Sequence, residues 1–407
     1  MSPKAIVARR LRGKFNLKTI KDLDVREKRV LVRVDFNVPL DEAGKITDDT
    51  RISATLPTIR YLLDQGAKVI LMSHLGRPKG KVAEKLRMNE VARKLGEMLG
   101  KEVQKVDDCV GPAVEAAVAR LRPGDVLLLE NLRFHPEEEG NDREFARKLA
   151  SLADIYANDA FGTAHRAHAS TAGVAEFLPA VAGFLMEKEV NALGRILTDP
   201  EHPFAAVLGG AKISDKIGVL ENLLGKVDQL LLGGGMANTF LRAEGYGLGN
   251  SLVDEESVGF ARDFLRRARA GGVAVELPVD LVISQNSGAG ETRIVSPGEV
   301  PEGWRALDIG PRTTEHFTRL IQKAKTVFWN GPLGVFEQPE FARGSEAVAR
   351  ALARPGLTSV VGGGDTLAVL ERTGVAGLVT HASTGGGASL EFLEGKELPG
   401  VAVLAKN

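Results

Sequence analysis

Short apolar runs alternate along the chain with longer amphipathic stretches. In the first half these runs cover 30–34, 68–72, 125–130 and 154–157. Between the second and third runs, apolar residues recur every three or four positions from Asn89 to Leu99, which places them on one helical face. Apolar runs separated by helices are typical of a parallel sheet built from strand–helix–strand units.

The second half repeats this order. Its apolar runs cover 204–208, 229–232, 281–284, 326–329, 359–361 and 378–380. They are rich in Val, Leu and Ile and lack regular alternation, as expected for strands covered by helices on both faces. We therefore predict an α/β fold with two Rossmann-like, doubly wound parallel sheets.

A chain of 407 residues is longer than one hydrophobic core usually supports, so we expect two domains. A continuous helical pattern from Met186 to Leu197 separates the two halves, and it ends at Asp199-Pro200, where proline stops a helix. We predict a hinge helix there, joining an N-terminal domain over 1–185 to a C-terminal domain over 186–389.

The composition excludes several classes of protein. Lys plus Arg (53) equals Asp plus Glu (53), so nothing favours nucleic acid or an anionic membrane as a partner. No apolar run approaches the roughly 18 residues of a membrane helix. The single cysteine, Cys109, cannot form an internal disulfide, which fits a reducing, cytoplasmic compartment, and we expect it to be a core residue rather than a nucleophile.

The first 21 residues are basic, with seven Lys or Arg and no acid. Their apolar patch is too short for a secretory signal. We therefore expect a loosely packed extension here, the alternative being an organelle-targeting leader.

Ligands of open parallel sheets bind where loops leave the carboxyl ends of the strands. In the first half the segments after the predicted strands carry arginines, histidines and other polar residues: Asp35, Asn37, Arg51, His74, Arg77, Arg133, His135, His165, Arg166 and His168. Converging arginines would focus positive charge and suit bidentate capture of phosphate or carboxylate. The alternative is a set of unrelated, solvated arginines.

In the second half the corresponding loops are rich in glycine, at 209–210, 233–235, 362–364 and 385–387. Glycine lets phosphate approach the backbone amides of a helix N-terminus. Nearby, Lys212 and Lys216 can neutralise phosphate charge, and Asp365 can ligate Mg²⁺ or cap a helix. Neither G-x-x-x-x-G-K-[ST] nor G-x-G-x-x-G is complete, which disfavours a Walker-type nucleotidase and a dinucleotide dehydrogenase.

Nine motifs lie between residues 33 and 396, and the resemblance that they carry runs from about residue 17 to the C-terminus. They are RVDFNVP at 33–39, SHLGRP at 73–78, ENLRFHPEEE at 130–139, NDAFGTAHRAHAS at 158–170, LGGAKISDKI at 208–217, GGGMANTF at 233–240, WNGPLGVFE at 329–337, GGGDT at 362–366 and STGGGASLEFLEGK at 383–396. In these motifs the chain resembles the phosphoglycerate kinase family. The resemblance implies reversible phosphoryl transfer between 1,3-bisphosphoglycerate and ADP, giving 3-phosphoglycerate and ATP, in glycolysis and gluconeogenesis. It also implies ATP/ADP and Mg²⁺ as cofactors, small-molecule substrates, no nucleic-acid or membrane partner, and a monomer.

The resemblance assigns roles to individual residues. Those implied to hold 3-phosphoglycerate or the bisphosphate are Asp35, Phe36, Asn37, Arg51, His74, Leu75, Gly76, Arg77, Arg133 and Arg166. Those implied to meet the nucleotide are Lys216, Gly234, Gly235, Asn330, Glu337, Gly363, Gly364, Asp365 and Thr366. Within that set, Gly234 and Gly235 line the adenine pocket, Glu337 holds the ribose and Asp365 ligates Mg²⁺. Those implied to surround the phosphoryl group in transfer are Arg51, Lys212 and the amides at 385–387, including that of Gly386. The segment from about 390 to 407 is implied to return to the N-terminal domain.

Phosphoryl transfer needs positioned cations and amides rather than an enzyme nucleophile, and it needs the two ligands brought together without water. We therefore expect closure about the hinge helix and no covalent intermediate. The main alternative is a non-catalytic, nucleotide-driven clamp that binds a partner through the arginines. The presence of Lys212, Lys216 and Asp365 together favours the enzyme.

Overall fold

The computed structural model describes residues 15–285 and 290–405. Residues 1–14, which make up most of the predicted basic extension, lie outside the described residues. The chain forms two compact units, which we call unit 1 and unit 2. Unit 1 runs to Asn191 and includes the chain again from Glu397, and unit 2 is Ala192–Lys396.

The division between the units differs in detail from the predicted one. Helix α7 (Phe184–Thr198) covers the predicted hinge helix and crosses the division, which lies at 191/192 rather than at 185/186. The returning segment begins at Glu397 rather than at about 390. The reason is local, because α14 (Gly387–Leu393) packs against α8 (Ile217–Leu223) of unit 2, and Asn222 Nδ2 donates to the Leu393 carbonyl over 2.6 Å.

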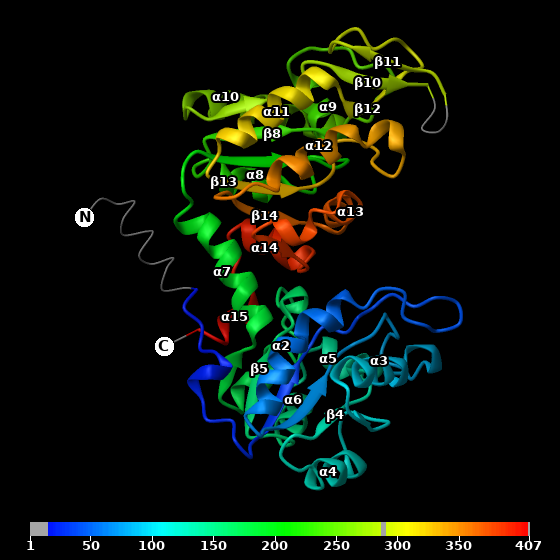
Figure 1. Cartoon of the computed structure of the whole chain (residues 1–407), viewed down its shortest axis with the longest axis vertical. Coiled ribbons are helices and arrows are strands. Elements are labelled where there is room, and N and C mark those ends of the chain that lie inside the picture. The colour runs from blue at the N-terminus through cyan, green and yellow to red at the C-terminus, as the bar shows by residue number, and fades with distance from the viewer. Residues whose placement is uncertain (1–14, 286–289, 406–407) are drawn as a thin grey trace, which may run out of the picture. The chain divides into compact units, whose positions relative to one another are not determined.

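Unit 1 is built on a six-stranded parallel sheet in the order β3-β4-β2-β1-β5-β6 (Figure 1). The strands are β1 (Arg29–Arg33), β2 (Lys68–Met72), β3 (Gln104–Lys105), β4 (Val126–Leu128), β5 (Ile155–Asn158) and β6 (Ala180–Ala182). The helices are α2 (Thr50–Asp64), α3 (Asn89–Leu99), α4 (Pro112–Ala119), α5 (Pro136–Glu139), α6 (Arg143–Ala150) and, from the C-terminal segment, α15 (Pro399–Ala402).

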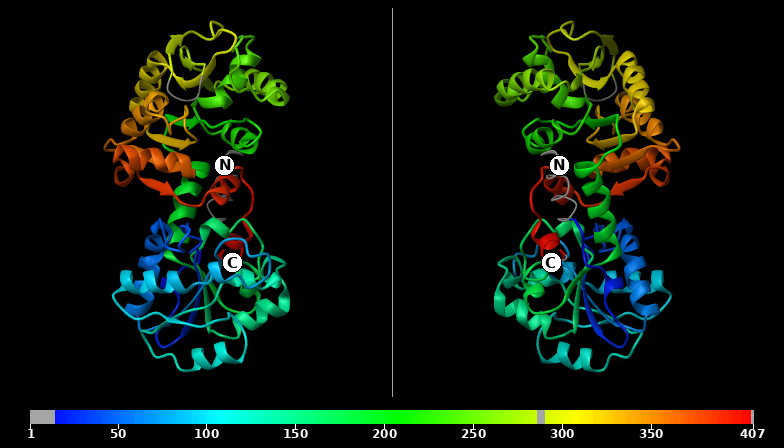
Figure 2. Two further views of the ribbon diagram at one scale, coloured as in Figure 1. Left: turned by 90° about the vertical axis from the view of Figure 1, so that its right-hand side faces the viewer. Right: turned by 90° about the vertical axis from the view of Figure 1, so that its left-hand side faces the viewer.

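Both faces of this sheet are buried. Val30 and Val69 pack in one core cluster with Ile59 of α2 and Leu95 of α3. Leu31, one position along β1, is also fully buried although it points to the other face. The side views in Figure 2 show helices on both faces of each sheet. Such two-sided burial explains why the strand sequences are continuous apolar runs.

Unit 2 contains a second six-stranded parallel sheet, in the order β15-β14-β13-β7-β8-β9. The strands are β7 (Phe204–Leu208), β8 (Gln229–Leu232), β9 (Ala274–Glu276), β13 (Thr326–Asn330), β14 (Thr358–Gly362) and β15 (His381–Ser383). Besides α8 and α14, the helices are α9 (Gly234–Ala243), α10 (Val258–Ala270), α11 (Pro311–Lys323), α12 (Arg343–Leu352) and α13 (Gly364–Thr373). The predicted class, α/β with two parallel sheets, is confirmed.

Two of the strand predictions in unit 2 were wrong, one in the sheet that the strand joins and one in the residues that form the strand. Residues 281–284 form β10 (Leu281–Ser284), which pairs antiparallel with β11 (Thr292–Val295) and β12 (Arg305–Ile309) in a separate three-stranded sheet. Leu281, Ile283 and Ser284 are buried and Val282 is partly buried, so this run has the pattern of a buried strand, and hydrophobicity could not show which sheet it joins.

The run at 378–380 is not a strand either. Residues Ala376–Leu378 form a 3-10 helix with Leu378 64% exposed, and β15 begins at His381. Here the buried strand residues, His381 and Ser383, are polar, so hydrophobicity could not locate the strand.

In both sheets the strand that comes first along the chain lies in the middle. β1 lies between β2 and β5, and β7 lies between β8 and β13. Loops that leave two such neighbouring strands diverge and create a crevice at the carboxyl edge of the sheet. Each unit therefore has one topological position that favours a ligand site.

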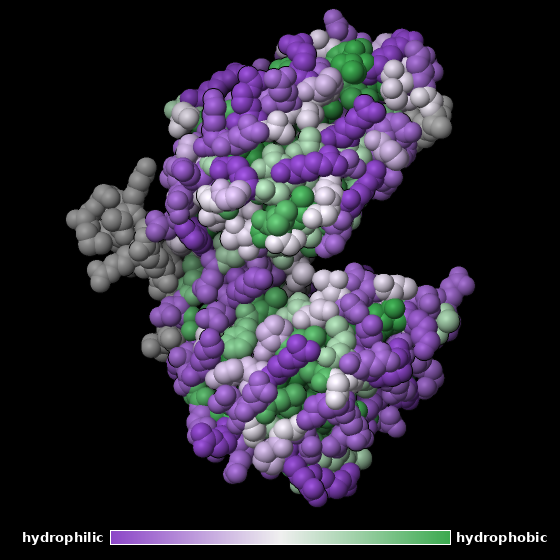
Figure 3. Space-filling view, viewed as in Figure 1, coloured by the Kyte–Doolittle hydropathy of each residue, from purple (hydrophilic) through white to green (hydrophobic). Residues whose placement is uncertain are grey.

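No described helix is long and apolar enough to cross a membrane. On the face seen in Figure 3, hydrophilic residues cover most of each unit.

Candidate active site

The polar residues predicted to follow β1, β2, β4 and β5 lie at one edge of the unit 1 sheet. Because the strands are parallel, the loops after them leave on the same side. These loops carry the predicted substrate residues at 35–37, 74–77, 133 and 166, and Arg51 is the second residue of α2, which follows the first loop. The structure thus brings the predicted substrate residues to the switch point of this sheet.

Asp35 and Arg51 hold each other at this edge. Nη1 of Arg51 lies 3.1 Å from each carboxylate oxygen of Asp35, which is buried, while the Arg51 side chain is 40% exposed. Among the contacts of the described residues, only Nη1 of Arg51 is engaged. Asp35 therefore orients the guanidinium and leaves its Nε and Nη2 donors for an anion.

The backbone of Gly76 is fixed from two sides. Its N–H donates to Asn37 Oδ1 over 2.8 Å, and its carbonyl accepts from Arg133 Nη1 over 3.3 Å. Its φ of +62° favours glycine, and an added Cβ would lie 2.8 Å from Leu86 Cδ2, so the end of the Leu86 side chain would have to shift. The loop over 74–77 thereby has a fixed path between two other predicted substrate residues.

Two histidines of this edge, His74 and His168, are neutral near pH 7. His74 is buried, with Nδ1 3.1 Å from Arg33 Nη2, and burial followed by the charge of Arg33 holds the pKa of His74 well below its usual value. Burial and then the charge of Arg133 lower the pKa of His168 to about 4. The positive charge at this edge therefore comes from arginines, which suits phosphate or carboxylate binding.

Arg133 also has an unused buried donor. Its Nε has no hydrogen-bond partner, and its ion pair with Glu139 Oε1 is 3.7 Å long. Because buried donors are normally satisfied, this atom fits a site that takes up an anion.

The remaining predicted substrate residues differ in exposure. Arg77 and Arg166 are exposed, so their side chains can reach a ligand from solvent. Phe36 and Leu75 are buried, which limits them to packing and backbone contacts. The Phe36 N–H, for example, already donates to Ser73 Oγ over 2.9 Å.

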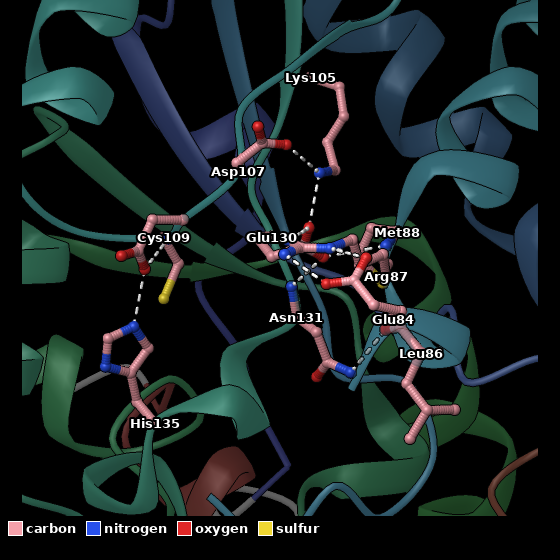
Figure 4. Close-up of polar contacts among 11 residues, drawn as sticks. Glu84, Leu86, Arg87, Met88, Lys105, Asp107, Cys109, Glu130, Asn131 and His135 are labelled. Atoms are coloured by element: carbon pink, nitrogen blue, oxygen red, sulfur yellow. Dashed lines mark hydrogen bonds and ion pairs between the residues drawn. The ribbon is translucent and has the colours of Figure 1, made fainter. Parts of the chain in front are cut away.

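The sequence analysis did not predict the two residues that join these loops, Glu130 and Asn131. Figure 4 shows both of them. Asn131 Oδ1 accepts from the Leu75 and Arg133 N–H groups at 3.2 and 3.1 Å, and its Nδ2 donates to the Leu75 carbonyl over 2.7 Å. Buried Glu130 in turn accepts from the Asn131 N–H over 2.8 Å and from Lys105 Nζ over 2.7 Å. An acid and an amide directly after an all-apolar strand were the available signal.

The glycine-rich loops of unit 2 meet at the switch point between β7 and β13. Lys216 Nζ donates to the carbonyls of Gly209 and, over 3.2 Å, of Asn330, which end or follow these two strands. Burial lowers the pKa of Lys216 to about 8. The two carbonyls hold the ammonium at this crevice, where ligands of parallel sheets bind, and its positive charge is suited to phosphate.

A pocket of about 500 Å³ opens beside Gly210, and a Cβ added to that glycine would lie 3.2 Å from Lys216 Nζ. Of the predicted nucleotide residues, Gly234, Gly235, Glu337 and Asp365 line it, together with apolar side chains such as Leu252. Its volume and its mixture of apolar walls with a few polar groups are typical of small-molecule sites.

The glycines of this pocket are required by their surroundings. An added Cβ on Gly234, whose φ is +67°, would lie 2.7 Å from the Gly210 carbonyl oxygen, and one on Gly235 would lie 2.5 Å from that of Ala211. Only glycine lets these backbone segments approach so closely.

The last glycine-rich loops precede α13 and α14. Gly363, with φ +95°, precedes α13, and Thr366 in its first turn accepts from the Gly331 N–H over 2.7 Å. Asp365 is exposed and lines the pocket, so its oxygens fit Mg²⁺, which usually takes one or two carboxylates together with substrate phosphates. Lys212 and Gly386 are exposed.

Several residues that line the pocket were not predicted, and Asp308 is the one with an unusual charge environment. Asp308 is buried in the wall, accepts from the Gly344 and Ile309 N–H groups at 3.0 and 2.8 Å, and has its pKa raised by burial to about 7. An acid within the apolar run ALDI was the only signal in the sequence.

Comparison with known proteins gives a consistent result across the chain. Residues 20–396 match the family Phosphoglycerate kinase. A phosphoglycerate kinase of Moorella thermoacetica is 63% identical over 389 residues, which are 95% of this chain and 99% of that protein. One of Pelotomaculum thermopropionicum is 60% identical over 95% of this chain and 98% of that protein. The solved structure of phosphoglycerate kinase from Coxiella burnetii is similar with a TM-score of 0.89 and 43% identity, over 96% of this chain and all of that one.

Proposed function

The chain belongs to the phosphoglycerate kinase family, and we propose that unit 1 binds its three-carbon substrate while unit 2 binds its nucleotide. As a member of this family it is a phosphotransferase of glycolysis, which exchanges a phosphoryl group between 1,3-bisphosphoglycerate and ADP. The observation that carries the division of roles is the contrast at the two switch points, with arginines at one and a glycine-lined pocket at the other.

In unit 1 the arginines pair with the anionic groups of the substrate. Arg51, Arg133, Arg77 and Arg166 supply the guanidinium groups, and neutral His74 supplies a hydrogen bond without adding charge. Asp35 and Asn37 set the positions of Arg51 and of the Gly76 backbone, as described above. This assignment gives each polar group at the edge either a ligand contact or a positioning contact.

In unit 2 the base lies against Gly234 and Gly235, and Glu337 accepts from the ribose hydroxyls. The phosphates lie near Lys216, Asn330 and the first turn of α13, where helix N–H groups favour negative charge, and where Gly363, Gly364 and Thr366 precede or begin the helix. Asp365 is the residue that would hold Mg²⁺, which when bound neutralises phosphate charge.

Transfer itself is a direct displacement. In the direction of ATP synthesis, a β-phosphate oxygen of ADP attacks the phosphorus of the acyl phosphate, and the bond from that phosphorus to the carboxyl oxygen breaks. The electron pair stays on the departing carboxylate of 3-phosphoglycerate, so no proton transfer and no enzyme nucleophile are required. Arg51, Lys212 and the Gly386 amide stabilise the charge on the equatorial oxygens.

Because Arg51 belongs to unit 1 and Lys212 to unit 2, we further propose that the units close when both ligands are bound, about helix α7. Small-angle scattering should report greater compaction with both ligands than with either one. An unchanged profile with both ligands bound contradicts closure.

The proposed function is tested by a coupled assay of ATP formed from 1,3-bisphosphoglycerate and ADP by the pure chain. A non-catalytic clamp would bind the ligands without forming ATP. A thermal-shift comparison is the control, in which Mg²⁺-ADP and 3-phosphoglycerate raise the melting temperature and NAD does not. We also propose that the chain acts as a cytoplasmic monomer, which sedimentation of the 43.5 kDa chain tests for its oligomeric state.

A further inference from the structure

A group of metal-binding side chain types lies in unit 1, in a different unit from the nucleotide pocket. Asp108, Cys109 and His135 each offer one ligand atom, and these atoms all lie within 4.8 Å of one another. Within the described ranges this is the one group of three or more such side chains. Asp108 and Cys109 lie between β3 and α4, and His135 directly precedes α5. In Figure 4 the sulfur of Cys109 points toward the ring of His135.

The three side chains are already oriented. Asp108 Oδ1 lies 2.7 Å from His135 Nε2 and accepts from the Cys109 N–H over 2.7 Å. The His135 ring stacks on Phe145 with centroids 5.1 Å apart, and its Nδ1 lies 4.0 Å from a carboxylate oxygen of Glu137. A histidine with one nitrogen toward a ligand position and the other toward a carboxylate is the usual arrangement at metal sites.

The surroundings of the thiol are negative. Cys109 is fully buried, and after burial itself the charges of Asp108 and Glu138 raise the pKa of the thiol. Glu138 is also fully buried, and its Oε2 has no hydrogen-bond partner, although Arg133 interacts with it by charge. A buried carboxylate oxygen without a donor is rare, and a cation nearby would compensate it.

We propose that Asp108, Cys109 and His135 bind a borderline-soft divalent cation of the Zn²⁺ class. Thiolate and imidazole ligands select such ions over Mg²⁺, which prefers oxygen. On binding, the metal–sulfur bond forms as the thiol releases its proton to solvent. His135 Nε2 also loses to solvent the proton that it donates to Asp108, while Nδ1, which faces Glu137, takes one up, so the imidazole stays neutral and the metal replaces the contact between Nε2 and Asp108. Three protein ligands leave a fourth position for water, and the ion can enter because the Asp108 side chain is 52% exposed and that of His135 28%.

This site can be tested with CoCl₂ as the probe, because cobalt bound to a thiolate gives a near-ultraviolet charge-transfer absorption. Cys109 is the only cysteine, so this absorption can arise from no other thiol of the chain. The full, reduced chain is titrated in excess Mg²⁺, which occupies oxygen-ligand sites. We expect the absorption to rise to one cobalt per chain and to disappear when ZnCl₂ is added.

Variants of the three ligand residues distinguish cobalt binding at this site from adventitious binding elsewhere on the chain. Cys109→Ser should abolish the absorption, and His135→Gln should weaken cobalt affinity by about tenfold or more. The matched control is His202→Gln, since His202 pairs with Asp228 at 2.6 Å in unit 2 without a cysteine, and it should leave the titration unchanged. If His135→Gln does not fold, as judged by circular dichroism, Asp108→Asn replaces it with the same expectation. No thiolate absorption at saturating CoCl₂, or full affinity in the folded ligand variant, overturns the proposal.

Discussion

The two halves of the proposed active site use different parts of the polypeptide. At the unit 1 edge the ligand-facing groups are side chains held by other side chains, such as Arg51 by Asp35 and His74 by Arg33. In the unit 2 pocket close backbone approaches shape the site, and Gly234 lies against the backbone of Gly210. A site made of side chains should lose function by degrees as each is removed, whereas a site made of backbone should fail when a single Cβ is added.

The contrast between the two halves does not apply to the transfer step, because one phosphoryl group needs cations from both of them. We expect the largest losses of activity when these cations are removed. Arg51→Ala and Lys212→Ala should each lower kcat by about two orders of magnitude or more, because both cations act on charge that develops in the transition state. Nucleotide affinity should change little. Steady-state kinetics beside melting curves provide the measurement, and a folded Lys212→Ala protein with full kcat excludes the transfer role.

Asp365 is the one residue proposed to hold Mg²⁺ at the nucleotide, and the expected effect of changing it is next in size. Asp365→Asn keeps the shape of the side chain but removes its charge, so kcat/KM for ADP at limiting Mg²⁺ should fall by about tenfold to a hundredfold. Binding of 3-phosphoglycerate, measured by calorimetry, should stay as in the parent chain. Normal turnover at limiting Mg²⁺ would remove Asp365 from the metal site.

Gly234→Ala tests the backbone half. The added methyl group meets the Gly210 carbonyl and forces an unfavourable φ, so we expect the KM for ADP to rise by about tenfold, a change of about 1.4 kcal/mol. The matched control is Gly225→Ala, since an added Cβ there meets nothing within 4 Å. Equal KM values for the two variants contradict the proposed role of backbone approach.

Arg77→Ala tests the half of the site that is built from side chains, in which removing one side chain should reduce function only in part. Removing one exposed guanidinium should raise the KM for 3-phosphoglycerate by about tenfold, the scale of one charge-assisted hydrogen bond, with kcat nearly unchanged. Arg147→Ala is the control, because that arginine is also exposed in unit 1 but pairs with Glu144 on α6. A large fall in kcat for Arg77→Ala would place that arginine with the transfer residues instead.

Lys216 should give the smallest effect, which is a dependence on pH. As pH rises, its contribution to stability should improve while its contribution to nucleotide binding should weaken. Burial lowers its pKa to about 8 from an ordinary 10.5, so the folded chain binds fewer protons than the unfolded chain between those values. Below pH 8 the cost of burying the charge is present in full, and it is relieved as pH rises, so this residue's contribution to stability increases from pH 8 to 10.5. The charge available to phosphate falls over the same range, so the KM for ADP should rise severalfold. In Lys216→Met both trends should be absent, as pH-dependent melting and kinetics can report.

Much of the fold followed from hydrophobic pattern, because strands buried on both faces leave a continuous apolar run. The pattern did not show that β10 joins a separate antiparallel sheet, and it did not locate β15, whose buried residues His381 and Ser383 are polar. The order of strands within each sheet also came only from the structure, since pairing between distant segments has no local signal.

The candidate site shows a similar limit. Residues expected to contact ligands could be found because they follow strands, but those that position them could not. Arg33, the last residue of β1, is fully buried, and its Nε donates to Ser170 Oγ over 2.7 Å. Nothing in the run VLVR distinguishes it from a solvated side chain. Asp308 was missed for a similar reason, since one of its two backbone partners, the Gly344 N–H, comes from a distant segment.

The central claim is that this chain moves a phosphoryl group directly from 1,3-bisphosphoglycerate to ADP. It is tested most directly by supplying 1,3-bisphosphoglycerate whose transferable group is a chiral, isotopically labelled thiophosphoryl group, and by determining the configuration at phosphorus in the thio-ATP that forms. A single in-line displacement predicts that thio-ATP forms with inverted configuration. Retention of configuration, which requires a phosphorylated enzyme intermediate, or no nucleotide product at all would contradict the account.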